Sequence, residues 1–162
     1  MKKLKKLKKV ATVLAALLVM GPLFYPLPLN AQQDIEFDLS GLVIETADGS
    51  ILKFNVELAE SSAQKSRGLM FRREMAPDAG MLFLHSKDRV LTMWMANTIL
   101  PLDMLFIAAD GKIARIQEQT IPQSREVISS RKRVRAVLEL NAGTVRKHAI
   151  SVGDRVIHNH FN

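Results

Sequence analysis

The chain has 162 residues, of which 48% are hydrophobic and 24% are charged, a composition typical of a globular protein. It contains no cysteine. Disulfide frameworks, thiolate nucleophiles and cysteine-ligated zinc or iron–sulfur centres are therefore excluded. The length suits one domain of moderate size and is too short for two large ones.

The amino terminus follows the pattern of a secretory signal peptide. Residues 2–9 include six lysines, and an uncharged, mostly apolar run extends from Val10 to Met20. Three prolines follow, and Ala31 supplies the small residue expected at a cleavage site. We therefore expect residues 1–31 to be a cleaved secretory signal peptide.

This pattern predicts a protein that works outside the cytoplasm. Cleavage leaves residues 32–162 as a single β-rich domain in the periplasm or the extracellular space, with no stable transmembrane helix. The alternative is a retained anchor, because residues 10–29 carry no charge and are long enough to span a bilayer. The prolines in the second half of that stretch disfavour a spanning helix, so cleavage is the favoured interpretation.

Most of the excess positive charge belongs to the amino-terminal segment. The formal net charge is +7, and removal of six lysines together with no acidic residue leaves +1 for residues 32–162. A nucleic-acid partner is therefore not expected. Arg131, Arg133 and Arg135 alternate along one predicted strand. We interpret them as charges that protect an edge strand from aggregation, with binding of an anionic envelope polymer as the alternative.

The predicted domain is rich in short strands, about eight in all. Apolar and polar residues alternate in most of its segments, a period typical of half-buried strands. Asp48-Gly49 and Asp110-Gly111 each lie between two such segments and predict tight β-hairpins. Strands are expected, in chain order, at residues 35–39, 42–46, 52–58, 81–84, 89–95, 102–108, 112–117, 134–140 and 156–157.

Two minor helices interrupt the strands. Ser61 or Ser62 can cap a helix that extends to about Phe71, and Asn141 can cap a last short helix over residues 143–148. With these helices, the strand pattern predicts a mainly β single domain that forms an antiparallel β-sandwich or a partly open barrel.

Several motifs in the middle of the chain carry a family resemblance. The segment from Ser66 to Arg72 reads SRGLMFR, and it is followed in order by GMLF, WMANT, LDMLFI and VLELNAG. This series resembles the Domain of Unknown Function 192 family of small, often exported bacterial and archaeal proteins, over about residues 51–157. The resemblance implies a small, mainly β, sandwich-like fold, and it implies no established activity. Ala96 departs from the family pattern, which usually has a polar or basic residue there.

Residues 94–103 are rich in polar groups that a hydrophobic core does not need. Asp103 lies amid apolar neighbours, so its carboxylate must be paired or hydrogen-bonded, and Arg67 or Arg72 is the expected partner. The interpretation as a purely structural cluster stays open. For this cluster alone the structural interpretation is the favoured one, and among functions our leading hypothesis is a non-enzymatic module that binds a small anionic or amide-bearing molecule, or an envelope component. Its expected ligand-binding residues are Arg67, Arg72, Trp94, Asn97, Thr98 and Asp103.

Two hypotheses from other classes remain. The first is an envelope hydrolase or transferase that uses Asp103 or Glu139 as general acid or base. The second is a soft-metal carrier that binds Cu(I) through methionines such as Met93 and Met95, although core packing is the favoured explanation of the methionines.

No familiar catalytic motif supports an enzyme. The sequence has no GxSxG elbow, no HExxH pair and no phosphate-binding loop. His158 and His160 form an HxH pair near the carboxyl terminus, where a frayed tail is the default expectation. We expect no cofactor and no metal, and the sequence does not indicate an oligomeric state.

Overall fold

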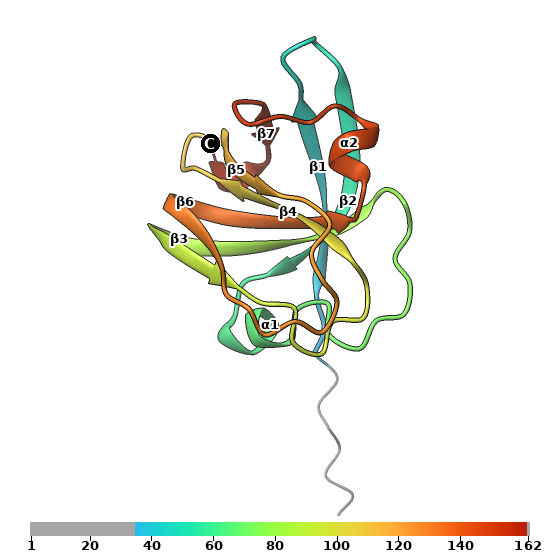
Figure 1. The fold of residues 1–162 in the computed structure, drawn as a ribbon. Helices are drawn as coiled ribbons and strands as arrows, with labels where there is room; N and C mark the ends of the chain where they lie inside the picture. Colours follow the sequence, from blue (N-terminus) through green and yellow to red (C-terminus); the bar gives the residue numbers. More distant parts are fainter. Residues whose placement is uncertain (1–34, 162) are drawn as a thin grey trace, which may run out of the picture. The chain divides into compact units, whose positions relative to one another are not determined.

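A computed structural model of the chain describes residues 35–161. The segment predicted to be a signal peptide, residues 1–31, lies outside the described residues. Two short α-helices and a seven-stranded sheet make up the described part (Figure 1). The elements in chain order are β1 (Asp38–Glu45), β2 (Ile51–Ala59), α1 (Ser62–Arg67), β3 (Ala79–Met93), β4 (Leu102–Ile107), β5 (Ile113–Gln117), β6 (Ile128–Asn141), α2 (Thr144–Lys147), β7 (Arg155–Ile157) and the 3₁₀ turn η1 (Asn159–Phe161).

Both predicted hairpins are confirmed. The β1–β2 turn is held by Asp48, whose carboxylate accepts hydrogen bonds from the Thr46 hydroxyl and from the Ser50 amide, and Gly49 adopts φ 85°. In the β4–β5 turn the Asp110 carboxylate accepts the Lys112 amide at 3.1 Å. Gly111 there has φ 81°. A positive φ at the second turn residue is what an Asp-Gly pair supplies with little strain.

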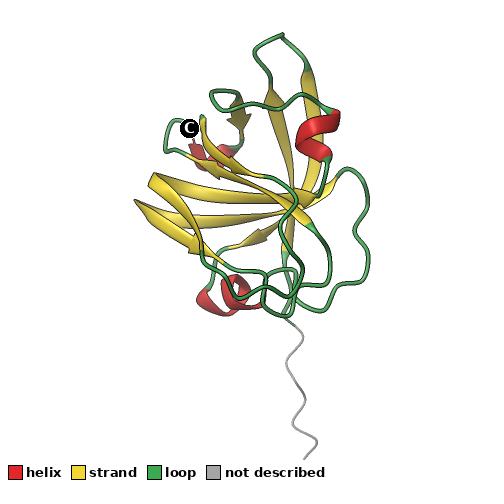
Figure 2. Cartoon of the chain, in the orientation of Figure 1, coloured by secondary structure: helices red, strands yellow, loops and turns green. Residues whose placement is uncertain are grey.

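The strands form one mixed sheet in the order β5-β4-β6-β3-β2-β1-β7. Strands β2 and β3 pair in parallel, and the other neighbouring strands pair antiparallel. The parallel pair requires a crossover, which residues 60–78 provide with α1 in their path (Figure 2). The two longest strands, β3 and β6, lie side by side in the middle of this order.

The two ends of the sheet approach each other closely enough to form a nearly closed barrel. An isolated bridge joins Lys112, just before β5, to Arg155 in β7. The Ile113 amide donates to the Asp154 carbonyl at 2.9 Å, and the Val156 amide donates to the Gly111 carbonyl at 2.8 Å. The prediction of a mainly β single domain with two short helices and a partly open barrel is therefore confirmed, with one parallel strand pair.

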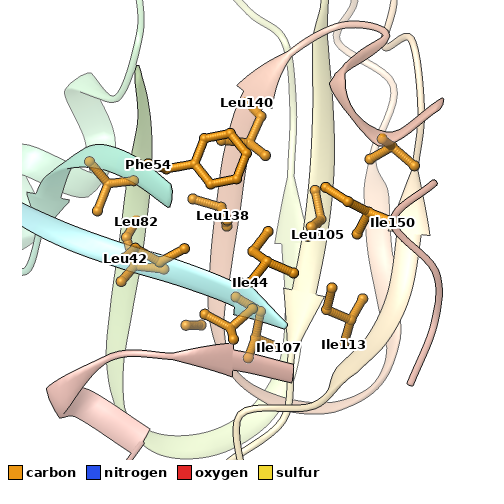
Figure 3. Packing of buried hydrophobic residues seen from close by; sticks show 14 of the residues in the cluster. Leu42, Ile44, Phe54, Leu82, Leu105, Ile107, Ile113, Leu138, Leu140 and Ile150 are labelled. Carbon is orange, nitrogen blue, oxygen red and sulfur yellow. The ribbon is translucent and has the colours of Figure 1, made fainter. Parts of the chain in front are cut away.

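Each face of the central strands carries its own hydrophobic core. The first core fills the barrel with residues from all seven strands, including Leu42, Phe54 and Leu138 (Figure 3). The second core lies on the opposite face of β3, β4 and β6, beneath the segments that contain Leu69 and Met95. Because side chains alternate along a strand, neighbouring residues of β6 serve different cores.

Two local predictions were wrong. The strands predicted at 81–84 and 89–95 are one strand, β3, which ends at Met93 and whose pairing with β6 shifts register between Leu84 and Arg89. The His158 side chain is buried at 8% exposure and η1 follows it, in place of a frayed tail. The alternating arginines lie in β6, which pairs with β3 along most of its length but with β4 only over residues 136–141, so the arginine-bearing part of β6 has a strand partner on one side.

The capping prediction for the last helix was also wrong. Gly143 is the N-cap of α2 and supplies no side-chain hydrogen bond. The Asn141 amide group instead donates to the carbonyls of Met75 and Ala76. By contrast, Ser61 caps α1 as expected, in a reciprocal capping box with Gln64. In the part of the chain that the structure describes, no helix is long and apolar enough to cross a membrane.

Substitution of Gly111 tests the closure of the barrel. A Cβ at Gly111 would lie 2.6 Å from the Val156 carbonyl oxygen, whereas a Cβ at Gly49 would meet nothing within 4 Å. Both glycines have positive φ, so Gly49→Ala measures the backbone strain alone, about 1–2 kcal/mol. We expect Gly111→Ala to lower the free energy of urea-induced unfolding by about 1–3 kcal/mol more than Gly49→Ala. Equal losses would show that the β5 and β7 ends do not meet.

Candidate functional site

A groove of about 470 Å³ lies on the face of the sheet that carries the second core. Its walls come from α1, from the distal half of β3 and from the segment after β5. The residues that line it are Lys65, Ser66, Phe83, His85, Arg89, Val90, Leu91, Thr92, Met93, Trp94 and Val127. We call this hollow the groove.

The polar side of the groove is cationic. Lys65 and Arg89 both line it, and none of the described residues in its lining carries a carboxylate. Lys65 donates through Nζ to the Leu84 carbonyl at 2.9 Å, which fixes one of the two charges. Burial, and then the charge of Arg89, lower the pKa of Lys65.

The groove also contains an uncharged histidine. His85 Nδ1 lies 3.0 Å from a guanidinium nitrogen of Arg89 and can accept its hydrogen. Burial lowers the pKa of His85 to about 4, assisted by the charges of Lys65, Arg89 and His160. The imidazole is therefore neutral at neutral pH, and the charge of the groove comes from Lys65 and Arg89.

The apolar side of the groove is exposed to solvent. Trp94 is 57% exposed, Val90 is 52% exposed and Val127 is 67% exposed. Large apolar side chains exposed together beside a hollow are typical of binding sites. An aromatic ring and two cations in the lining of one hollow suit a ligand with an apolar body and an anionic end.

A smaller hollow of about 30 Å³ opens beside the groove and reaches Glu139. It shares five lining residues with the groove, among them Lys65 and Trp94. Glu139 is 4% exposed, and burial alone raises the pKa of its carboxyl to about 8. In residues 35–161 no side chain or backbone group forms a hydrogen bond with that carboxyl. We call this space the Glu139 hollow.

Three of the sequence-predicted ligand residues lie around these hollows. Trp94 lines both, and Arg67 and Thr98 line the Glu139 hollow. The guanidinium of Arg67 lies 5.2 Å from the centre of the Phe71 ring, so it stacks at the rim. Thr98 is buried at 5% exposure, and its backbone amide donates to the Met95 carbonyl.

The other predicted residues lie elsewhere. Arg72 forms a bidentate ion pair with Glu57 of β2. Asn97 is exposed, with φ 58°, and its carbonyl accepts the Phe71 amide at 2.9 Å. These contacts hold together the segments that cover the second core, so Arg72 and Asn97 shape the surroundings of the Glu139 hollow.

Asp103 lies on the opposite face of β4, and the predicted pairing with Arg67 or Arg72 is not formed. Its carboxylate is fully buried and accepts two backbone hydrogen bonds, from the Gln119 amide and from the Val145 amide, each at 2.9 Å. The need for partners was predicted correctly, but the partners are amides of two loops. Asp103 therefore fastens the β5–β6 loop and the start of α2 to the barrel.

Sequence reasoning missed Lys65, His85 and Arg89 as groove residues. Lys65 belongs to α1, whereas His85 and Arg89 flank the irregular part of β3. Residue spacing in the sequence does not predict that a helix residue and two residues of a bulged strand lie close together in space. The available signal was an excess of basic over acidic residues between 65 and 94, which does not single out these positions.

The described residues show no metal centre. In residues 35–161 no group of three or more histidine, aspartate or glutamate side chains is arranged to hold a metal ion. Met95 is 1% exposed and packs in the second core, whereas Met93 is partly buried and lines the groove. The two predicted copper ligands thus have different surroundings.

The fold and the groove together define a small mixed β-barrel protein with a ligand-sized hollow on its outer face. The family model for Domain of Unknown Function 192, described as uncharacterized ACR, matches residues 43–158, and the chain belongs to this family. A search of curated proteins found no match.

Two solved structures are similar to the chain. A Sinorhizobium meliloti 1021 protein, described as a candidate transcription regulator, is 47% identical, with a TM-score of 0.77 over 78% of this chain and 98% of its own. A protein of unknown function from Novosphingobium aromaticivorans DSM 12444 is 32% identical, with a TM-score of 0.71 over 74% of this chain and 85% of its own. Both solved structures therefore have a fold similar to that of this chain, and their descriptions name neither a reaction nor a ligand.

The substitution Asp103→Asn tests the structural role of Asp103. The asparagine side chain has one acceptor oxygen where the carboxylate has two, so one buried backbone amide loses its partner. We expect the free energy of unfolding to fall by about 1–3 kcal/mol. Asp110→Asn is the matched control, because Asp110 is exposed and accepts one amide, and it should cost less than about 0.5 kcal/mol. A loss at Asp103 as small as the control would contradict this role.

The pH dependence of stability tests the burial of Glu139. Its pKa is about 8 in the folded protein against an ordinary value of 4.5, so between these pH values only the unfolded chain loses the proton. The free energy of unfolding therefore falls as the pH rises through this window. Relative to Glu139→Gln, the wild-type protein should lose about 1.4 kcal/mol per pH unit there. Urea unfolding at several pH values measures this slope, and a constant difference would refute the burial of an uncharged carboxyl.

Proposed function

We propose that the protein is an exported, non-enzymatic module that binds a small anionic molecule with an apolar or aromatic body. The groove is the proposed site. The observation that carries the proposal is the pairing of two cations, Lys65 and Arg89, with the exposed ring of Trp94 in one ligand-sized hollow. Export rests on the predicted signal peptide in residues 1–31.

The chemistry of the groove favours anions over cations. A carboxylate or phosphate end can accept hydrogen bonds from Arg89 and lies near the Lys65 ammonium, and such charge-assisted bonds are the strong ones. The neutral His85 adds a polar contact and no third positive charge that would repel Lys65 and Arg89. The apolar body would cover Trp94 and Val127, which removes exposed apolar surface from water.

The proposal keeps the sequence-predicted residues in two roles. Arg67, Trp94 and Thr98 would contact the ligand or border it. Arg72, Asn97 and Asp103 would contribute by holding the covering segments in place. A nucleic-acid partner is not proposed, because the guanidinium of Arg135 lies 2.6 Å from the Asp88 carboxylate and that of Arg133 donates to the Asp88 carbonyl.

A hydrolase or transferase of the cell envelope is the second candidate. The observation that favours it is Glu139, whose pKa of about 8 is near the value that suits a general acid at neutral pH. Asp103, the other residue considered for this role, already uses both carboxylate oxygens on backbone amides. Turnover of a model ester or phosphate ester that disappears in Glu139→Gln would favour this candidate.

Binding of three matched probes tests the proposed site. The probes are 3-phenylpropionate, 3-phenylpropanol and 3-phenylpropylamine, which share one aromatic body and differ in charge. The chain has a single tryptophan, so the indole N–H signal of Trp94 in a ¹⁵N NMR spectrum reports on the groove alone. We expect the carboxylate to shift this signal in a saturable way and to bind at least about tenfold more tightly than the other two.

Two arginine variants separate the groove from general attraction of anions. Arg89→Gln should weaken binding of 3-phenylpropionate about five-fold or more, because it removes one of the two groove cations. Arg155→Gln removes an exposed arginine of β7 outside the groove lining and should leave the affinity unchanged. Equal binding of the three probes, or equal effects of the two variants, would contradict the proposal.

A further inference from the structure

Glu139 occupies the centre of a row of side chains that crosses the outer face of the sheet. The register places Met81 of β3 directly opposite Glu139 on one side and Met104 of β4 directly opposite on the other. Both methionines are fully buried. Directly opposed residues in a sheet have their Cβ atoms about 5 Å apart, so the carboxyl lies between two thioether side chains.

A carboxyl in this position lowers the stability of the folded protein. A carboxyl there, at 4% exposure, loses most of its contact with water, whereas a leucine at the same place would add to the second core. The described protein atoms supply no partner, and the carboxyl opens into the Glu139 hollow. A group outside the chain that completes the hydrogen bonding would explain why a carboxyl stands here.

The Glu139 hollow adjoins the groove. Lys65, Ser66, Phe83, Met93 and Trp94 line both spaces. A space of about 30 Å³ holds one water-sized group, such as a single ligand oxygen. A ligand whose apolar body lies on Trp94 can therefore place its polar end against Glu139.

We infer that Glu139, as a neutral carboxylic acid, donates a hydrogen bond to an anionic oxygen of the ligand and so selects oxyacid anions. This inference rests on the proposed function of the groove. Lys65 and Arg67 line the same hollow, so a ligand ammonium would be repelled there. A neutral acid, unlike an ionised carboxylate, does not repel an anionic ligand. Lys65 is then left to balance the charge of the ligand. The ligand class is then a carboxylate or a phosphate ester with an apolar body.

The charged groups around Glu139 determine which other titrations can change the affinity for an anion as the pH is varied. Lys65 and Arg67 face it from the α1 side. Beyond Met81 lies Glu57, which is paired with Arg72, and beyond Met104 lies the uncharged Gln117. Farther along β3, the pKa of His85 is about 4, so this group stays neutral above pH 6. Lys65 is thus the other group whose deprotonation can weaken anion binding at high pH.

The affinity for 3-phenylpropionate between about pH 6 and about pH 9 tests the inference, since the charge of this probe is constant there. Binding of an anion holds the proton on Glu139, so the wild-type dissociation constant should rise about five-fold or more from pH 7 to pH 9. Glu139→Gln keeps a neutral donor and should bind as tightly as wild type at pH 7, with less than about two-fold change across the range.

Two further variants complete the experiment. Glu139→Leu keeps an apolar core without a donor and should bind about five-fold or more weakly at pH 6. Glu45→Gln alters an exposed carboxyl of β1 that lines neither hollow and should retain the wild-type pH dependence. A wild-type affinity that is independent of pH, or a Glu139→Gln variant that loses affinity as wild type does, would overturn the role of Glu139 while leaving the groove as an anion site. Absence of a saturable Trp94 shift at every pH would overturn both.

Discussion

The antiparallel pairing of β3 with β6 is the constraint on which the rest of the structure depends. These strands give residues to both hydrophobic cores, so their separation fixes the barrel interior and the outer face together. Gly80 permits the close approach, because a Cβ there would lie 2.6 Å from the Glu139 carbonyl oxygen. The same pairing sets Met81 opposite Glu139 and thereby creates the apolar surroundings of that carboxyl. The groove lies along the irregular half of the pair, beyond Leu84.

The outer face combines two electrostatic features that belong together. At the rim, Lys65 and Arg89 are cations held near a histidine that stays neutral. At the floor, Glu139 is a carboxyl that burial keeps protonated near neutral pH. An ionised carboxylate there would cancel part of the positive field and repel an anion. A protonated one leaves the field intact and adds a donor, so the proposed anionic ligand would account for both the buried Glu139 and the cations of the groove.

Local chemistry made much of the fold predictable, and long-range pairing made the rest unpredictable. The Asp48-Gly49 and Asp110-Gly111 hairpins and the Ser61 cap depend on neighbours within a few residues, and all three are present. The alternation in β6 was visible in the sequence, but the strands that lie beside it, β3 and β4, could not be predicted from that alternation. Asp103 was correctly expected to need partners, yet the amides of Gln119 and Val145 meet it only through the closed barrel. Glu139 could be named from the sequence as a candidate acid. Its burial could not be predicted, because it depends on the neighbouring strands β3 and β4.

The most direct test of this account is the ¹³C NMR titration of the Glu139 side-chain carboxyl in the folded protein, assigned by comparison with Glu139→Gln. The account predicts a midpoint near pH 8, which moves upward when 3-phenylpropionate is present. A midpoint near 4.5, the ordinary value for glutamate, would contradict it. An elevated midpoint that the probe does not move would show that Glu139 is buried but takes no part in binding.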